Sequence, residues 1–307
     1  MSGFPGEDRP LLLSVWGLTD VGRSRSENQD AFVVLELPRE GLAPTFRLDP
    51  GATIDPGAPP VLALRDGALL LVVADGMGGA KGGATASGLA IEGIARRMVE
   101  HWAGERAPTP RHFVARLEEA IAATNQEVHR HAVMNPELNG MGTTATVAGI
   151  LDGIVYLAQV GDSRAYLVRN GEATQLTRDQ SMVQQLVESG ALSREEAERS
   201  PHRSVLLQAL GTAAQVEVAL TWHELKKGDR LLLCSDGLSG PVADEEIAEI
   251  MSSANSPDRA CEALVKLANE RGGPDNITTV VVRVEGGVPP AAVGDRARLR
   301  PFDLAPG

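Results

Sequence analysis

The residues of this sequence best suited to chemistry are aspartates at the ends of apolar segments. Asp75, Asp162, Asp236 and Asp275 stand where a predicted strand meets glycine, and Asp30 comes just before another strand. Taken alone, Asp75 would serve equally well as the cap of the helix that follows it. Several such acids along one chain are hard to explain as independent caps, because side chains at the ends of paired strands converge in space.

Carboxylates within a few ångströms of one another repel strongly, so a cluster of them needs protons or cations. No cysteine or histidine accompanies these five aspartates. A set of ligands that are all oxygen favours hard cations such as Mg²⁺ or Mn²⁺ over zinc. The aspartates therefore predict a site for Mg²⁺ or Mn²⁺ at one edge of a sheet.

Other polar residues have simpler interpretations. Arg25 and Asp30 are five positions apart beside a strand and, on their own, would be read as an ion pair. His129 and His131 are two apart on a predicted helix, so they point in different directions and make a poor metal pair. For His202 we favour a polar surface residue over a catalytic one.

The segment that must position Asp75 is the apolar run that precedes it. Residues 69–74 are consecutively apolar, and such a run stopped by glycine is typical of a strand buried on both faces. The glycines that follow let backbone groups approach a ligand with no side chain in the way. The same pattern, together with hairpin signals at Asp152-Gly153 and Asn170-Gly171, predicts strands over 11–19, 31–37, 69–74, 144–150, 154–160, 165–168, 231–235 and 277–284.

Helices are expected between these strands. Apolar spacing predicts one over 84–102 and a second that begins at Pro110 with Thr109 as its cap. Further helices are expected over 179–190, after the capping box that starts at Ser193, and over 244–252 and 257–271, capped by Asp244 and by Ser256.

The remaining segments have no clear periodicity. Residues 38–66 are rich in proline and glycine and predict an irregular insertion. The polar stretch 177–209 interrupts the rhythm of the strands and predicts a lid or flap. The termini, 1–10 and 286–307, are expected to be flexible.

Composition limits the class of protein. The chain has 307 residues, 43% of them hydrophobic, and a net charge of −12, which argues against nucleic acid or an anionic membrane as the main partner. Two cysteines, Cys234 and Cys261, suit a reducing compartment. With no apolar run near the roughly 20 residues that span a bilayer and no signal-like N-terminus, we expect a cytoplasmic protein.

At this point the chain resembles a known family. The ordered motifs are similar to those of the bacterial branch of the metal-dependent Ser/Thr protein phosphatases of type 2C (PPM), over about residues 11 to 285. Each motif is weak singly, but the ordered set is specific. It consists of Arg25-Ser26-Glu27-Asn28-Gln29-Asp30, Asp75-Gly76-Met77-Gly78-Gly79, Gly142-Thr143-Thr144, Gly161-Asp162-Ser163-Arg164, Ser235-Asp236-Gly237 and Gly273-Pro274-Asp275-Asn276.

The resemblance implies an α+β fold, a four-layer αββα sandwich of two antiparallel sheets flanked by helix pairs. It also implies roles for the acids at an edge of that sandwich. Asp75 would bridge two Mn²⁺ or Mg²⁺ ions, with Asp236 and Asp275 completing the first site. Asp30 and the Gly76 carbonyl would hold the second ion, while Asp162 and Asp236 would hold a possible third. Arg25 would bind the substrate phosphate, and the flap would help to select substrates.

The implied reaction is hydrolysis of phosphoserine and phosphothreonine in proteins by a hydroxide that bridges the metals. Two positions depart from the family pattern. Met77 stands where eukaryotic members carry a proposed general-acid histidine, so the group that protonates the leaving oxygen is unassigned. Gln29 stands where many members have glutamate, so the second ion should depend more on Asp30.

Three other readings compete with a protein phosphatase. Nucleotide binding at the glycine loop 76–83 is disfavoured, because the loop fits neither the phosphate-loop nor the dinucleotide pattern. The alternatives are an inactive or weakly active type 2C-like regulatory binding module, or an enzyme of this fold acting on another phosphorylated molecule. By analogy with bacterial family members, the expected partners are phosphorylated proteins and a Ser/Thr kinase of the same cell, and we expect a monomer.

Overall fold

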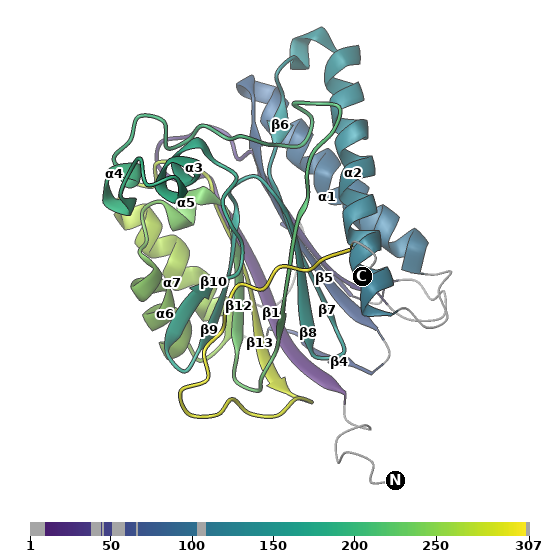
Figure 1. Cartoon of the computed structure of the whole chain (residues 1–307), viewed down its shortest axis with the longest axis vertical. Coiled ribbons are helices and arrows are strands. Elements are labelled where there is room, and N and C mark those ends of the chain that lie inside the picture. The colour runs from purple at the N-terminus through teal and green to yellow at the C-terminus, as the bar shows by residue number, and fades with distance from the viewer. Residues whose placement is uncertain are drawn as a thin grey trace.

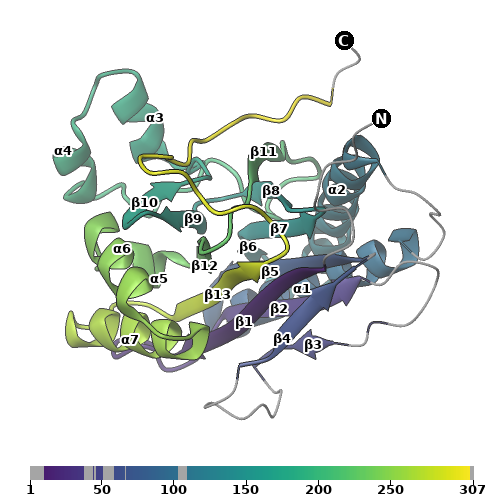
Figure 2. The ribbon, with the colours of Figure 1, turned by 90° about the horizontal axis from the view of Figure 1, so that it is seen from below.

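Two antiparallel sheets lie face to face in the computed structural model, which describes residues 10–37, 44, 46–50, 59–65, 67–102 and 109–304 (Figure 1). Helices cover both outer faces, so the described chain has four layers. Figure 2, turned by 90°, shows the same two sheets between the helix pairs α1 and α2 and α6 and α7. The fold expected from the sequence is confirmed.

Each sheet combines strands from distant parts of the chain, and neighbouring strands are antiparallel throughout the described residues. The first sheet has the order β10 (Glu172–Gln175), β9 (Arg164–Arg169), β12 (Arg230–Cys234), β13 (Ile277–Gly286), β1 (Leu11–Asp20) and β4 (Val61–Leu64). The second has the order β11 (Ala219–Glu224), β8 (Ile154–Val160), β7 (Ala145–Leu151), β5 (Ala68–Met77), β2 (Asp30–Leu37) and β3 (Arg47–Leu48), and β6 (Gly142–Thr143) pairs with the end of β5.

The helices divide between the two sheets. Those on the second sheet are α1 (Gly79–Trp102) and α2 (Pro110–Met134), followed by the short turn η1 (Pro136–Leu138). Those on the first sheet are α5 (Asp236–Ser239), α6 (Asp244–Ser253) and α7 (Pro257–Glu270). The predicted flap contains α3 (Met182–Glu188) and α4 (Arg194–Glu198).

Strand β5 shows why its sequence is continuously apolar. Leu69, Leu71 and Val73 pack into the core between the two sheets. The alternate residues of β5 pack instead beneath α1 and α2. Because both faces of the strand are buried, no polar residue is tolerated until Asp75, where the strand reaches the edge of the layers. The strand predicted from residues 69–74 is confirmed.

Local signals set several element ends. Asp152 and Gly153 both have positive φ, 50° and 77°, in the two-residue turn that joins β7 to β8. The Thr109 side chain accepts a hydrogen bond from the His112 backbone at the start of α2, and Ser193 forms the predicted capping box of α4. The cap predicted at Asp244 was wrong, because α6 begins at that residue and Ala243 precedes it as the cap.

Several short elements were not predicted from the sequence, among them β6, β10, β11 and α5. Strand β11 is half-buried and alternates Leu220 and Trp222 with Thr221 and His223 over only six residues, and α5 is only four residues long. The insertion 38–66 contains two short strands, since β3 pairs with β2 and β4 pairs with β1. The rest of that insertion lies largely outside the described residues, as do residues 1–9.

The C-terminal segment differs from the flexible tail that was expected. Residues 287–304 cross from the end of β13 toward α2 (Figure 1). Trp222 of the edge strand β11 donates its backbone N–H to the Arg300 carbonyl at 2.9 Å, and Phe302 donates to the Leu220 carbonyl at 2.9 Å. The Phe302 ring packs edge-on against Tyr156. The free edge of β11 and this aromatic contact hold the segment, and neither is visible in a proline-rich composition.

No helix among the described residues combines the length and the apolar character that crossing a membrane requires.

Candidate metal centre

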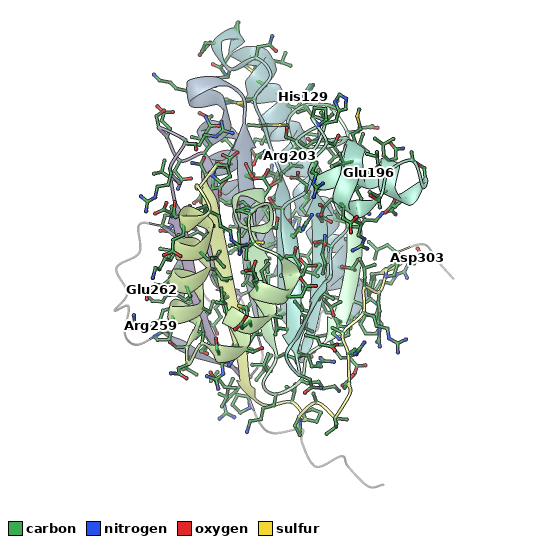
Figure 3. The ribbon with its side chains drawn as sticks, turned by 90° about the vertical axis from the view of Figure 1, so that its left-hand side faces the viewer. His129, Glu196, Arg203, Arg259, Glu262 and Asp303 are labelled. Carbon is green, nitrogen blue, oxygen red and sulfur yellow. The ribbon has the colours of Figure 1, made fainter. Side chains whose placement is uncertain are left out.

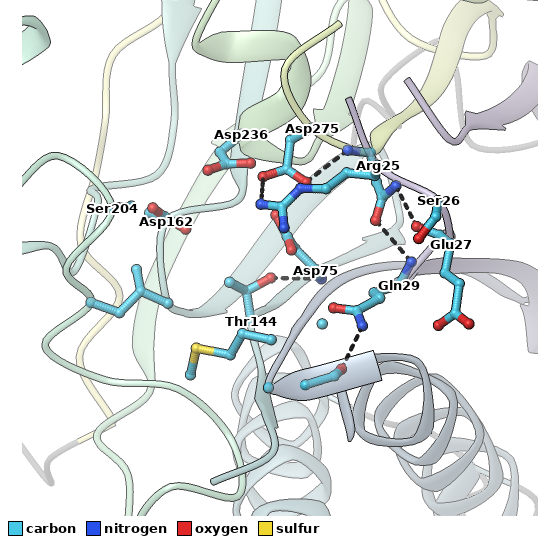
Figure 4. Close-up of a pocket in the computed structure, with 16 residues that line it drawn as sticks. Arg25, Ser26, Glu27, Gln29, Asp75, Thr144, Asp162, Ser204, Asp236 and Asp275 are labelled. Carbon is cyan, nitrogen blue, oxygen red and sulfur yellow. Dashed lines mark hydrogen bonds and ion pairs between the residues drawn. The ribbon is translucent and has the colours of Figure 1, made fainter. Parts of the chain in front are cut away.

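The five predicted aspartates come together at one edge of the sandwich. A cavity of about 420 Å³ opens there, and Figure 4 shows the side chains that line it. Its walls include Asp75, Asp162, Asp236 and Asp275, together with Arg25, Gly76 and the flap residues Ser204 and Leu206. Asp30 lies beside Asp75, because the neighbouring strands β2 and β5 pair these two residues. We call the five aspartates the acid cluster.

Burial makes the acid cluster electrostatically unfavourable. Burial, followed by the charges of Asp30 and Asp236, raises the pKa of Asp75 well above its usual range. Burial raises the pKa of Asp30 to about 7 and, with the charge of Asp236, that of Asp162 to about 8. These pKa shifts have two causes: burial, the larger one, disfavours the charged form of each carboxylate, and the neighbouring carboxylates add their repulsion.

Two oxygens of the acid cluster have no partner. The Ser235 hydroxyl donates to Asp30 Oδ2 at 2.6 Å, but Asp30 Oδ1 is buried without a hydrogen bond. Asp236 Oδ1 is buried and unpartnered as well. Buried polar atoms in folded proteins nearly always have partners, so an unpartnered carboxylate oxygen facing other carboxylates indicates a place for a cation.

The donor set fits Mg²⁺ or Mn²⁺, because all of its side-chain groups are carboxylates. Within the described part of the chain, no three His, Cys, Asp or Glu side chains are already arranged around a metal position. Arg25 lies among the acids instead, donating from Nη2 to Asp275 Oδ2 at 2.7 Å (Figure 4). Arg25 therefore pairs with Asp275, and not with Asp30 as the simple ion-pair interpretation of the sequence predicted.

Hydroxyl groups fix the backbone around Asp75. The Asp75 N–H donates to Thr144 Oγ1 at 2.9 Å, and the Asp75 carbonyl accepts from the Thr143 hydroxyl at 2.9 Å. The Thr144 hydroxyl also bonds to the Ser163 hydroxyl at 2.7 Å, next to Asp162. These hydroxyls therefore connect the two chain segments that carry Asp75 and Asp162 and limit how far these acids can separate.

The flap is attached to the acid cluster at its first residues. Arg164 donates three hydrogen bonds to the Asp179 carboxylate, at 2.7 to 3.0 Å. Gln180 bonds to the Gly161 backbone in both directions, at 2.8 and 2.9 Å. The far end of the flap reaches the cavity through Ser204 and Leu206. The helices α3 and α4 lie farther out, where Glu196 is exposed (Figure 3).

Several supporting residues were not singled out by sequence reasoning. The motifs that were noted include Ser235, Thr144, Ser163 and Asn276, yet none of these four residues was assigned a task. Their signal was the recurrence of small polar residues beside each predicted ligand. His202 is exposed, as expected. His129 is not simply solvated, because its Nδ1 bonds to the Gly211 carbonyl at 2.9 Å.

Comparison with known proteins decides the family. The protein phosphatase 2C family model matches residues 61–272. The chain belongs to the protein phosphatase 2C family. The resemblance seen in the motifs is therefore confirmed.

Two relatives are named serine/threonine phosphatases. PstP of Mycobacterium tuberculosis is 43% identical over 218 residues, which cover 71% of this chain and 41% of PstP. This chain therefore spans less than half of that relative. The phosphatase stp of Listeria innocua is 37% identical over 219 residues, covering 71% of this chain and 85% of stp.

A solved structure of similar fold contains manganese. The catalytic domain of PstP in complex with two manganese ions is 34% identical, with a TM-score of 0.70. The superposition covers 90% of this protein phosphatase 2C chain and 100% of that domain.

Proposed function

We propose that this chain is a metal-dependent protein phosphatase that hydrolyses phosphoserine and phosphothreonine in proteins. The observation that carries the proposal is the acid cluster, which brings four carboxylates to one cavity with Asp30 beside them and leaves two buried oxygens without partners. The phosphatase names of its relatives and the manganese ions bound by the PstP catalytic domain support the same conclusion.

The positions of the acids support distinct roles. Asp75 has Asp30, Asp236 and Asp162 as its electrostatic neighbours, which suits a ligand shared by two ions. Asp236 and Asp275 would complete the first site, and Asp30 with the Gly76 carbonyl would hold the second. Asp162, for which Asp236 is the strongest neighbouring charge, would share a third ion with it. Bound Mn²⁺ or Mg²⁺ supplies a water of lowered pKa and polarises the phosphoryl group.

Arg25 is placed to bind the substrate phosphate. Its side chain is 55% exposed at the cavity mouth, and its one described partner is Asp275. A guanidinium can hold two phosphate oxygens through parallel N–H donors, so exchange of Asp275 for phosphate would orient the ester and offset the charge that develops on its oxygens. Met77, which also lines the cavity, has no proton to give the leaving oxygen, and that role stays unassigned.

The flap would contribute to the choice of protein substrate. Ser204 and Leu206 line the cavity opposite the Arg25 loop, so a peptide that carries its phosphate to Arg25 would pass between them. A Ser/Thr kinase of the same cell as partner and a monomeric state stay predictions. The free, buried Cys234 and Cys261 support the cytoplasm as its location.

The alternative is a regulatory binding module with little or no activity. The acid cluster argues against it, because all the matched aspartates reach or adjoin the cavity. An enzyme acting on another phosphorylated molecule would use the same acids and would differ in the flap.

The test is hydrolysis of a phosphothreonine peptide by the wild type with Mn²⁺, with EDTA, and by Asp236→Asn with Mn²⁺. We expect activity only in the first case. Hydrolysis of a small aryl phosphate but of no phosphopeptide would favour another phosphorylated substrate. No hydrolysis of either by the Mn²⁺-loaded wild type would favour the binding module.

A further inference from the structure

The loop that carries Arg25 has no regular secondary structure of its own. Residues 21–29 connect β1 to β2 through turns and bends. A side chain on such a loop is aimed only if the loop is tied to something rigid, since free loop residues retain backbone entropy. The contacts that tie this loop therefore decide where the Arg25 guanidinium points.

The side chain of Asn276 ties both ends of the loop. Its Nδ2 donates to the Val21 carbonyl at 2.9 Å and to the Glu27 carbonyl at 2.9 Å. Its Oδ1 accepts from the Gln29 N–H at 2.9 Å. An asparagine amide has two N–H donors and one oxygen, so each polar atom of this side chain is committed to the loop. Asn276 is only 5% exposed, which shields these bonds from water.

Asn276 is itself held firmly. Its N–H donates to Asp275 Oδ1 at 2.8 Å. A Cβ atom on Gly237 would approach the Asn276 carbonyl to 1.9 Å, so the first sheet and the start of α5 leave the residue no room to move. The residue thus joins a rigid part of the acid cluster to an irregular loop.

Backbone contacts support the same loop and limit the effect to be expected. Arg23 and Ser24 both donate their N–H groups to the Gly273 carbonyl, at 2.8 and 3.1 Å. Glycine at position 22 permits a close approach, because a Cβ there would lie 2.1 Å from the Asp275 carbonyl. Loss of the Asn276 side chain would therefore loosen residues 25–29 without releasing the whole loop.

We propose that Asn276 is a positioning residue that aims Arg25 at the substrate phosphate by tying the Val21 and Glu27 carbonyls and the Gln29 N–H. The inference rests on the proposed function in one respect, which is that Arg25 binds phosphate. Asn276 borders the cavity, but both of its amide N–H groups and its amide oxygen are already bonded to the loop. Its contribution should therefore appear in phosphate affinity and should disappear when Arg25 is absent.

The experiment is a double-mutant cycle read by binding rather than by turnover. Inorganic phosphate is titrated into the Mn²⁺-loaded wild type, Asn276→Ala, Arg25→Ala and the double variant. We expect Asn276→Ala to weaken phosphate binding about 10-fold, in the range seen for residues that orient a binding group. On the Arg25→Ala background the same change should add less than about 2-fold, because coupled residues do not act additively.

Three controls separate positioning from general damage. Mn²⁺ affinity should be unchanged in Asn276→Ala. Amide hydrogen exchange should rise at residues 25–29 and not at Arg23 or Ser24. The matched variant Asn125→Ala also removes a buried amide that bonds to a loop, at Gly211 and Ala213, and it should leave phosphate affinity unchanged.

Additive losses of phosphate affinity in the cycle would overturn the proposal. It would also be overturned if Asn276→Ala lost as much Mn²⁺ affinity as phosphate affinity, because Asn276 would then only support Asp275. A wild type that binds no phosphate would also overturn it. Coupled, Arg25-dependent phosphate binding by a protein that hydrolyses no phosphopeptide would support the inference and contradict the proposed function, so the two failures are distinct.

Discussion

The acid cluster has a counterpart elsewhere in the molecule, a charged group built around a buried ion pair. Arg169 on β9 donates to both carboxylate oxygens of Asp229, at 2.9 and 2.7 Å, and to the Glu224 carbonyl at 2.8 Å. Asp295 of the C-terminal segment lies 3.4 Å from the same guanidinium. We call Arg169, Asp229 and Asp295 the arginine cluster.

The two clusters differ in how their charge is balanced. In the arginine cluster, the Lys226 N–H adds a further donor to Asp229, and the Arg169 and Asp229 side chains are 3% and 1% exposed. In the acid cluster, the direct arginine contact among the described residues is the exposed Arg25 at Asp275. A buried charge that is satisfied within the chain serves stability, whereas one that is left short of positive charge is held for a ligand.

The largest effect should come from removing a charge of the acid cluster. We expect Asp75→Asn to lower phosphopeptide hydrolysis by more than about 1,000-fold, because several kcal/mol of charge stabilisation depends on the ions it holds. The same change should raise the free energy of unfolding in EDTA, because it relieves repulsion. Urea unfolding and phosphate release measure the two effects. If Asp75→Asn lost stability in EDTA as well as activity, the contrast between the two clusters would be contradicted.

The converse change belongs to the arginine cluster. We expect Asp229→Asn to lower the free energy of unfolding by about 3–5 kcal/mol, because Arg169 would stay buried without its main countercharge. Activity per folded molecule should stay at the wild-type level, since no residue of this cluster lines the cavity. Urea unfolding and hydrolysis at a temperature where the variant is folded provide the measurement. Normal stability in this variant would show that Asp295 alone balances Arg169.

The metal-free acid cluster should destabilise the protein as pH rises. Burial and neighbouring charges raise the pKa of Asp30 to about 7 and that of Asp162 to about 8. Between about pH 4 and pH 8 the folded state therefore binds more protons than the unfolded state, so stability in EDTA falls through this range. Urea unfolding should show a flatter slope for Asp162→Asn and for the Mn²⁺-loaded wild type. Equal slopes with and without Mn²⁺ would contradict the interpretation.

The smallest effect concerns His223, which lies beside the arginine cluster. Burial, followed by the charges of Arg169 and Arg300, lowers the pKa of this imidazole, while Asp229 and Asp295 oppose that shift. The unfolded chain therefore takes up the proton first, and stability should fall below about pH 6.5 by at most about 1.4 kcal/mol per pH unit. His223→Phe should flatten this acid limb in Mn²⁺. If His223→Phe lost stability below pH 6.5 as steeply as the wild type, the loss would have to come from other titrating groups.

The sequence predicts the acids well and their supports poorly, for a physical reason. Asp75 and Asp236 end apolar strands, and that boundary is a local pattern that a sequence displays. The hydrogen bond from Ser235 to Asp30 joins residues 205 positions apart. The bonds from Asn276 to Val21 and Glu27 span about as far. Such roles depend on which strands become neighbours, and no local pattern contains that information.

The same reason explains the errors in the fold. Strand β5 was predictable because both of its faces are buried. Strand β11 is half-buried at a sheet edge, and its alternation of Leu220 and Trp222 with Thr221 and His223 is too short to fix a strand on its own. The segment 287–304 is ordered by that edge and by Tyr156, so its placement follows from a strand that was itself missed.

The most direct test of the central claim is to count the metal ions that the acid cluster binds. Wild-type protein freed of metal with EDTA and then dialysed is titrated with Mn²⁺ by isothermal calorimetry, beside Asp75→Asn and the arginine-cluster variant Asp229→Asn. We predict two tightly bound ions per chain for the wild type and for Asp229→Asn, apart from a weaker third ion at Asp162 and Asp236, with both tight sites weakened at least tenfold in Asp75→Asn. The account would be contradicted if the wild type bound no Mn²⁺ at millimolar concentration, or if Asp75→Asn bound Mn²⁺ as tightly as the wild type does.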